Sequence, residues 1–161
     1  MRTLWGESFP DFVDDELGSL TGSIDLLPKP PPESPIPVYA TGHSGQSLDW
    51  IAQNTDGWMY YPRNAYMLQQ NILQWEEALS RAGQPRKPYL QSLYIDLTED
   101  PSAMPVPIHL GYRLGRYALT EHLHNLARAG VNHVIFNLKF AARPVSEVLD
   151  ELAQDVLKEI K

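Results

Sequence analysis

The sequence contains no cysteine, and this absence removes several classes of site. A chain without thiols has no disulfide, no thiolate nucleophile and no zinc or iron–sulfur centre built on sulfur. Basic residues are also scarce, since 13 Lys and Arg stand against 20 Asp and Glu, for a formal net charge of -7. Binding along a nucleic-acid backbone needs clustered cations, so a nucleic-acid partner is excluded. Carboxylate, imidazole and hydroxyl chemistry remain.

Long apolar runs are missing as well. Stretches such as VIFNL from Val134 are far shorter than a membrane span, and the first residues, MRTLWGESFPDFVDDEL, lack the regions of a signal peptide. We therefore expect a cytoplasmic protein with no membrane partner. The 161 residues, 43% of them hydrophobic, suffice for one domain with a core.

Residues 1–36 have little periodicity, and six prolines fall between Pro28 and Pro37. Such a segment is extended or loop chain. It is either a linker after a separate domain or a long loop that leads into the first strand of the unit that follows. We favour the loop, because too few residues precede it to make a domain. The predicted division is a Pro-rich lead-in over 1–36 and a structured unit over 37–161.

After Pro37 the pattern alternates between strand and helix four times. The predicted strands are 37–41, 57–61, 89–97 and 132–138. The predicted helices are 47–54, 63–83, 115–129 and a last one that begins at Pro144. We expect the strand at 37–41 to be buried and the proline-bearing chain after residue 97 to be a loop. The last helix carries one apolar stripe, formed by Val145, Val148, Leu149, Leu152, Val156, Leu157 and Ile160.

Four βα units in a row imply parallel strands joined by right-handed crossovers. Two α/β architectures fit: an open sheet with helices on both faces, or half of a (β/α)8 TIM barrel. The central strands of an open sheet are almost wholly apolar, whereas these strands carry polar residues such as Gln91, Asp96 and Asn137. This polarity favours barrel strands whose ends line a site.

The turn after the first strand reads Gly-His-Ser-Gly-Gln-Ser over residues 42–47. A strand, a glycine-bearing turn and a helix in succession place helical N–H groups at the carboxyl end of the sheet, where they attract an anion. Gly42 and Gly45 allow close approach, and Ser44 and Ser47 provide hydroxyl donors. The spacing fits equally well a turn in which Ser44 only caps the helix. Neither a Walker loop nor a G-x-G-x-x-G motif is present.

Two blocks of sequence resemble one known family. VYATGHSGQSLDWIAQNTDGWMYYPR resembles the region between the fifth and sixth strands of the bacterial luciferase-like, flavin-dependent monooxygenases. IHLGYRLGRYALTEHLHNLARAGVNHVIFNLKFAARPVSEVLDELAQDVL resembles the C-terminal end of a luciferase-type oxidoreductase subfamily in that group. The resemblance implies the C-terminal half of a (β/α)8 barrel, about four βα units, with the first four strands outside this chain.

By matching positions, the resemblance also implies a cofactor site. The turn would hold the phosphate of reduced FMN with Ser44 and Ser47 as donors, while Tyr61 would lie beside the flavin and Arg63 would reach the phosphate. The implied cofactor-binding set is Gly42, His43, Ser44, Gly45, Gln46, Ser47, Tyr61 and Arg63. No catalytic residue and no metal ligand is assigned, because the strands that carry the catalytic side chains are not in this chain.

The implied function is that of an FMN-dependent oxidoreductase or monooxygenase. Its partners would be a small organic substrate, dioxygen and a reductase that supplies the reduced flavin, with this chain contributing the phosphate half of the site. One alternative is a deazaflavin-dependent reductase that transfers hydride, and another is a non-catalytic half-barrel that serves as an interaction module. Half a barrel leaves two strand edges open, so we expect a homo-oligomer or association with a missing N-terminal half, unless the lead-in covers one edge.

The chain after the third predicted strand holds further polar candidates. One interpretation is that His109, Tyr112, Arg113 and Arg116 clamp an anionic substrate or cover the flavin. The other is that Arg113 and Arg116 simply pair with acidic neighbours at the start of the helix. His133, on the fourth strand, is expected to be a hydrogen-bonded barrel residue.

Overall fold

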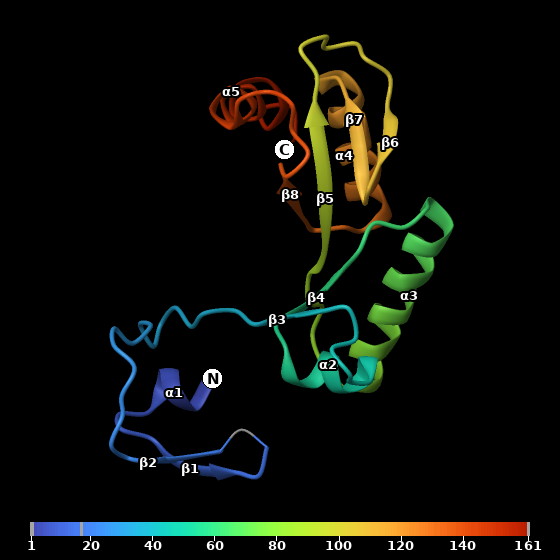
Figure 1. The fold of residues 1–161 in the computed structure, drawn as a ribbon. Coiled ribbons are helices and arrows are strands. Elements are labelled where there is room, and N and C mark those ends of the chain that lie inside the picture. The colour runs from blue at the N-terminus through green and yellow to red at the C-terminus, as the bar shows by residue number, and fades with distance from the viewer. Residues whose placement is uncertain (1, 17, 161) are drawn as a thin grey trace. The chain divides into compact units, whose positions relative to one another are not determined.

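The computed structural model describes residues 2–16 and 18–160, and the chain divides into two compact units, Met1–Pro37 and Val38–Lys161. The first unit holds a short helix α1 (Arg2–Gly6) and an antiparallel hairpin of β1 (Asp11–Asp14) and β2 (Gly18–Thr21), drawn in blue in Figure 1. The Lys29 ammonium donates to the carbonyl oxygens of Leu4 and Glu7, each at 2.7 Å, and pairs with the Asp25 carboxylate. These bonds tie the proline-bearing segment to α1.

The second unit carries the alternating pattern that the sequence predicts. Four strands run parallel in the order β3 (Tyr39–Thr41), β4 (Gly57–Tyr60), β5 (Tyr89–Leu97) and β8 (His133–Asn137). The helices between and after them are α2 (Leu48–Asn54), α3 (Ala65–Arg81), α4 (Arg116–Ala129) and α5 (Val145–Glu151), and α5 continues as a π-helical turn over Leu152–Val156. The sheet is curled and mostly parallel, consistent with part of a (β/α)8 barrel.

Helices α3 and α4 form where the apolar spacing predicts them. Leu68, Ile72, Trp75 and Leu79 are buried on α3, and Leu119, Leu123 and Leu126 on α4. Each such side chain contributes about 1.5 to 3 kcal/mol when it is fully buried. Gly130 ends α4 with a left-handed φ of 107°, the conformation that favours glycine after a helix.

The strand at 37–41 is not buried, so that prediction was wrong. In the part of the chain that the structure describes, β3 pairs with β4 alone, and Tyr39 is 40% exposed. An outer strand has no neighbour on one side to shield it, and its three residues present too little apolar surface to be covered. Position in the sheet, which a single segment does not reveal, decides the burial of β3.

The predicted loop after residue 97 also proved partly wrong, because it holds two short strands. The strands β6 (Val106–Ile108) and β7 (Gly111–Leu114) form a hairpin, and β7 lies parallel to the carboxyl-terminal part of β5, from Tyr94 to Leu97. Pro107 is tolerated because β6 is an edge strand, where a missing N–H breaks no ladder bond. Gly111 permits the close approach of β7, since a Cβ there would lie 1.8 Å from the carbonyl oxygen of Tyr94.

The apolar stripe of the last helix is only half covered. Val148, Leu152 and Val156 are buried, but Val145, Leu149 and Leu157 are between 51% and 53% exposed. The change from α to π geometry at Leu152 alters the angular spacing of the residues that follow, so it bears on Leu157. Val145 and Leu149 come before this change, on the α-helical part of the stripe.

The two faces of the parallel sheet differ in burial. Leu93, Ile95 and Leu97 of β5 are 0% exposed and belong to the core that the helices cover. Residues on the other face, defined here as the open face, are mostly exposed or half-buried; they include Tyr39, Met59, Tyr94, His133 and Ile135. A barrel would enclose this face. Among the described residues no helix combines the length and apolar character needed to cross a bilayer.

Candidate functional site

The turn between β3 and α2 has an unusual backbone. Positive φ angles occur at Gly42 (57°), Ser44 (47°) and Gly45 (71°). Glycine adopts this left-handed conformation freely, whereas Ser44 pays about 1 to 2 kcal/mol for it. Turns that combine such angles with right-handed ones can direct successive backbone N–H groups toward an anion. Residues 43–47 are all exposed, so the turn is open to solvent.

Hydrogen bonds fix the turn onto the neighbouring strand. The Gly42 N–H donates to the Met59 carbonyl at 2.8 Å, and the Trp58 indole N–H donates to the Gly42 carbonyl at 2.7 Å. The Gln46 N–H closes the turn on the His43 carbonyl at 2.8 Å. Within the described part of the chain, four N–H groups of the turn have no acceptor; they belong to His43, Ser44, Gly45 and Ser47.

The two serines of the turn have different roles. The Ser44 hydroxyl donates to the Thr41 carbonyl at 2.8 Å, so its proton is already used. The Ser47 hydroxyl accepts from the Trp50 N–H at 3.1 Å and caps α2. The reading in which Ser44 caps the helix is therefore wrong. Because Ser47 only accepts, its own proton remains available to a ligand.

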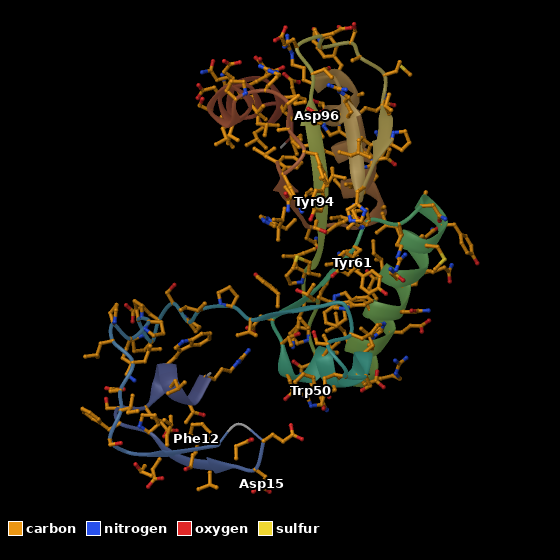
Figure 2. The ribbon with its side chains drawn as sticks, in the orientation of Figure 1. Phe12, Asp15, Trp50, Tyr61, Tyr94 and Asp96 are labelled. Atoms are coloured by element: carbon orange, nitrogen blue, oxygen red, sulfur yellow. The ribbon has the colours of Figure 1, made fainter. Side chains whose placement is uncertain are left out.

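The other predicted cofactor residues gather around Tyr60, which the sequence reasoning did not single out. The His43 ring lies 6.0 Å from the Tyr60 ring, and the Arg63 guanidinium carbon lies 5.4 Å from it. The Tyr61 ring is 6.1 Å from Tyr60 and is 46% exposed (Figure 2). Alternating aromatic residues in GWMYY were the signal that could have drawn attention to Tyr60. His43, Tyr61 and Arg63 thus each lie close to the Tyr60 ring.

The arginines after β5 are paired with acidic residues. Arg113 Nε lies 3.1 Å from Asp96 Oδ2, and Asp96 Oδ1 accepts from the Ala142 N–H at 3.0 Å. Arg116 Nη1 lies 3.0 Å from Glu151 Oε1. Both arginines are therefore in ion pairs, but the expected partners at the start of α4 are not the ones used: Asp96 is on β5 and Glu151 is on α5.

Glu151 is the centre of a clasp that also includes Arg143. Its Oε2 lies 2.6 Å from Arg143 Nη1, and its side chain is 11% exposed. Burial alone would raise the pKa of Glu151, but the two guanidinium groups outweigh burial and hold that pKa below its usual value. The clasp joins α5 to the start of α4, so we assign it a structural role.

Two histidines lie in contrasting surroundings. The His133 side chain is exposed and forms no hydrogen bond with a described residue, so its predicted role as a hydrogen-bonded barrel residue was wrong. His122 packs its ring 5.3 Å from Tyr112, and burial lowers the pKa of its imidazole. No group of three His, Asp or Glu side chains within residues 2–16 and 18–160 could hold a metal ion.

A surface hollow of about 420 Å³ lies between α4 and the chain after β5. Its lining includes Met104, Tyr117 and His122. None of the predicted cofactor residues lines it, so the hollow and the turn at 42–47 are separate features.

Comparison with known proteins extends the fold argument. No known family profile and no curated protein sequence matches the chain. Among solved structures, an F420-dependent secondary alcohol dehydrogenase in complex with an F420–acetone adduct superposes with a TM-score of 0.70 over 99% of this chain, at 16% identity. DmoA from Hyphomicrobium sulfonivorans superposes with a TM-score of 0.60 over 89% of this chain, at 11% identity.

These likenesses show the fold. The chain spans 58% of the length of the dehydrogenase and 44% of DmoA, so it corresponds to about half of each. At such identities the match concerns backbone arrangement, and the chemistry of this chain has to be argued from its own residues.

Proposed function

We propose that this chain is part of a flavin-type oxidoreductase and that the turn over residues 42–47 binds the phosphate of the cofactor. The observation that carries the proposal is the turn itself, where four unpartnered N–H groups lie beside the available hydroxyl of Ser47. The shared fold with an F420-dependent dehydrogenase supports it, as does the resemblance of the turn to that of the luciferase-like monooxygenases.

The residues of the turn and those around Tyr60 each have a physical role in this proposal. Backbone N–H groups hold phosphate oxygens, and the Ser47 hydroxyl donates one further bond. Hydrogen bonds to a charged group contribute about 1.5 to 3 kcal/mol each. Arg63 provides the positive charge, because its guanidinium lies over the Tyr60 ring and forms no ion pair with a carboxylate of the described residues. His43 and Tyr61 flank the cofactor, and Ser44 keeps the turn closed.

Either of two cofactors suits these donors. FMN ends in a phosphate monoester and F420 carries a phosphodiester, and both present oxygens that accept from N–H and O–H groups. When bound, the flavin or deazaflavin supplies the redox chemistry, with dioxygen as the co-substrate of a reduced flavin or with hydride transfer alone. This chain's residues bind and orient the cofactor toward a small organic substrate. In the FMN case a separate reductase supplies the reduced flavin.

A pair of substitutions at Ser47 separates phosphate binding from helix capping. Asn and Asp both serve as N-caps, so Ser47→Asn and Ser47→Asp should each preserve the start of α2. The Asp carboxylate would repel the phosphate and remove the donor, at a cost of about 1 to 4 kcal/mol for charges about 4 Å apart. We expect Ser47→Asp to weaken cofactor binding at least tenfold, and Ser47→Asn to weaken it by less than about threefold.

The measurement is a fluorescence titration of the whole chain with FMN and, separately, with F420. The cofactor that the wild-type chain binds more tightly identifies the type of chemistry. Equal affinities of wild type and Ser47→Asp would contradict the phosphate site, and so would a wild-type chain that binds neither cofactor.

A further inference from the structure

Three aromatic rings meet on the open face at the carboxyl ends of β5 and β8. Tyr94 is on β5, His109 is in the turn between β6 and β7, and Phe140 follows β8; we call them the aromatic corner. The ring centroids are 5.8 Å apart for Tyr94 and His109, 5.4 Å for Tyr94 and Phe140, and 6.3 Å for His109 and Phe140. The three segments are distant in sequence, so the fold assembles the corner. Figure 2 shows Tyr94 on β5, two residues before Asp96.

The aromatic corner is not part of the hydrophobic core. Phe140 is 42% exposed, His109 is exposed and Tyr94 is half-buried, and none of them belongs to the buried cluster. The planes of the His109 and Phe140 rings are nearly perpendicular, at 83° to each other. Aromatic rings that pack together while leaving surface in water offer a stacking site for another ring.

The backbone beside His109 is held in a costly conformation. Leu110 has a φ of 52° in the two-residue turn that carries His109. A left-handed leucine costs about 1 to 2 kcal/mol, and such strain persists only where surrounding contacts impose it. Here the Tyr94 N–H donates to the Leu110 carbonyl at 3.1 Å, which holds the turn against β5. The position of His109 is therefore fixed in advance of any ligand.

The charge around the corner is positive. The Lys139 ammonium lies 5.7 Å from the centre of the Phe140 ring. The acidic residue on the same face, Asp96, is 7% exposed and is already engaged by Arg113 and by the Ala142 N–H. An anionic group at the rim would meet Lys139 and would not meet an open carboxylate from Asp96.

The corner is separate from the turn at 42–47. Thr41 at the end of β3 pairs with Met59, which pairs with Leu90, and Tyr94 lies four residues farther along β5. Strand spacing and rise place Tyr94 about 10 Å across the sheet from Thr41, the last residue before the turn, and about 13 Å farther along it. A ligand in the corner would therefore occupy a different place from the phosphate in the turn.

We propose that Tyr94, His109 and Phe140 form a binding site for a planar aromatic compound that carries an anionic group such as a carboxylate. The ring packs against Phe140 with its edge toward His109 and takes the place of the Lys139 ammonium over the Phe140 ring, and the displaced ammonium pairs with the anion. Binding of the compound does not depend on a cofactor; only its role as the substrate of the oxidoreductase rests on the function proposed above.

The test uses 2-naphthoate as the probe, titrated by calorimetry into the full chain without cofactor. Cyclohexanecarboxylate has the same charge but no planar ring, and 2-naphthalenemethanol has the ring but no charge. Phe140→Leu keeps an apolar side chain and removes the ring, and Lys139→Met removes the charge. The matched control is Tyr66→Leu, since Tyr66 is an aromatic residue of α3 that is 69% exposed and outside the corner.

We expect the wild type to bind 2-naphthoate at least tenfold more tightly than cyclohexanecarboxylate. Phe140→Leu should weaken the binding of 2-naphthoate at least fivefold, whereas Tyr66→Leu should leave that affinity unchanged. Lys139→Met should weaken the binding of 2-naphthoate but not that of 2-naphthalenemethanol. Because Phe140 and Lys139 are exposed, these variants should fold normally, and far-ultraviolet circular dichroism checks this. Equal binding of both carboxylates, or equal effects of Phe140→Leu and Tyr66→Leu, would overturn the proposal. As a control, we expect Phe140→Leu to bind FMN and F420 with unchanged affinity, which would show that the effect on 2-naphthoate is independent of the phosphate site.

Discussion

Replacement of Glu151 by Gln is expected to destabilise the protein through one identifiable set of contacts. Both carboxylate oxygens are used, Oε2 by Arg143 at 2.6 Å and Oε1 by Arg116 at 3.0 Å. Arg143 also donates to the carbonyl of Thr98, just after β5, at 3.4 Å. Glu151 therefore links the last helix both to α4 and to the end of the central strand.

The size of the effect follows from burial. The exposed fractions of the side chains are 11% for Glu151, 16% for Arg143 and 29% for Arg116. These ion pairs are therefore intermediate between fully exposed and fully buried pairs. Removal of a buried partner costs about 3 to 5 kcal/mol and loss of a surface pair at most about 1 kcal/mol. The amide retains one acceptor but turns an N–H group toward a guanidinium. We expect a loss of about 2 to 3 kcal/mol in the free energy of unfolding.

Urea unfolding at neutral pH measures this loss, with Glu147→Gln as the matched control. Glu147 lies 3.9 Å from Arg143 and is 59% exposed, so its replacement should change stability by less than about 0.5 kcal/mol. The lowered pKa of Glu151 means that the clasp stabilises the protein above the pKa of an unfolded glutamate and is lost as pH falls through the lower folded value. Glu151→Gln should lose that part of the acid sensitivity. Equal stabilities of the two variants would refute this account of the clasp.

Two further predictions follow from the sheet and from the buried imidazole. Because burial lowers the pKa of His122 below 6.5, stability is greatest above that pH and is lost as pH falls toward the folded pKa. His122→Gln should therefore flatten the change in urea midpoint between pH 8 and pH 5.5, and an unaltered profile would argue against a buried neutral ring. Among residues 2–16 and 18–160, β3 and β8 each have a strand neighbour on one side only, and the open face leaves Tyr39 and Ile135 exposed. The chain should therefore associate with a second copy or with another half-barrel, and a stable monomer at tens of micromolar in light scattering would contradict the exposed-edge argument.

Elements with long apolar periods could be predicted from the sequence. The α3 and α4 helices repeat their buried leucines over several turns, and β5 appears with the predicted bounds of 89–97. The strands β6 and β7 were missed because segments of three and four residues are too short to show a period. The exposure of β3 depends on its place at the edge of the sheet, which only the pairing of distant segments determines.

The candidate site also has features that the local sequence predicts and features that depend on the folded structure. Local chemistry indicated the turn at 42–47, because glycines and serines between a strand and a helix are typical of an anion site, although they fit a plain helix cap equally well. It did not assign the two hydroxyls, since the bonds of Ser44 and Ser47 depend on backbone angles. The clasp around Glu151 joins residues 35 apart, and the aromatic corner joins three segments. No local pattern encodes either group.

The central claim is that the turn holds the phosphate of a flavin-type cofactor, and the backbone amide signals of residues 42–48 test it most directly. In a ¹⁵N-labelled chain titrated with FMN and with F420, we predict that one cofactor shifts the amide resonances of His43, Ser44, Gly45 and Ser47, whose N–H groups lack an acceptor among the described residues. The shifts should persist in Ser47→Asn and disappear in Ser47→Asp. Saturation by either cofactor with no change at these amides, or shifts confined to other parts of the chain, would contradict the account.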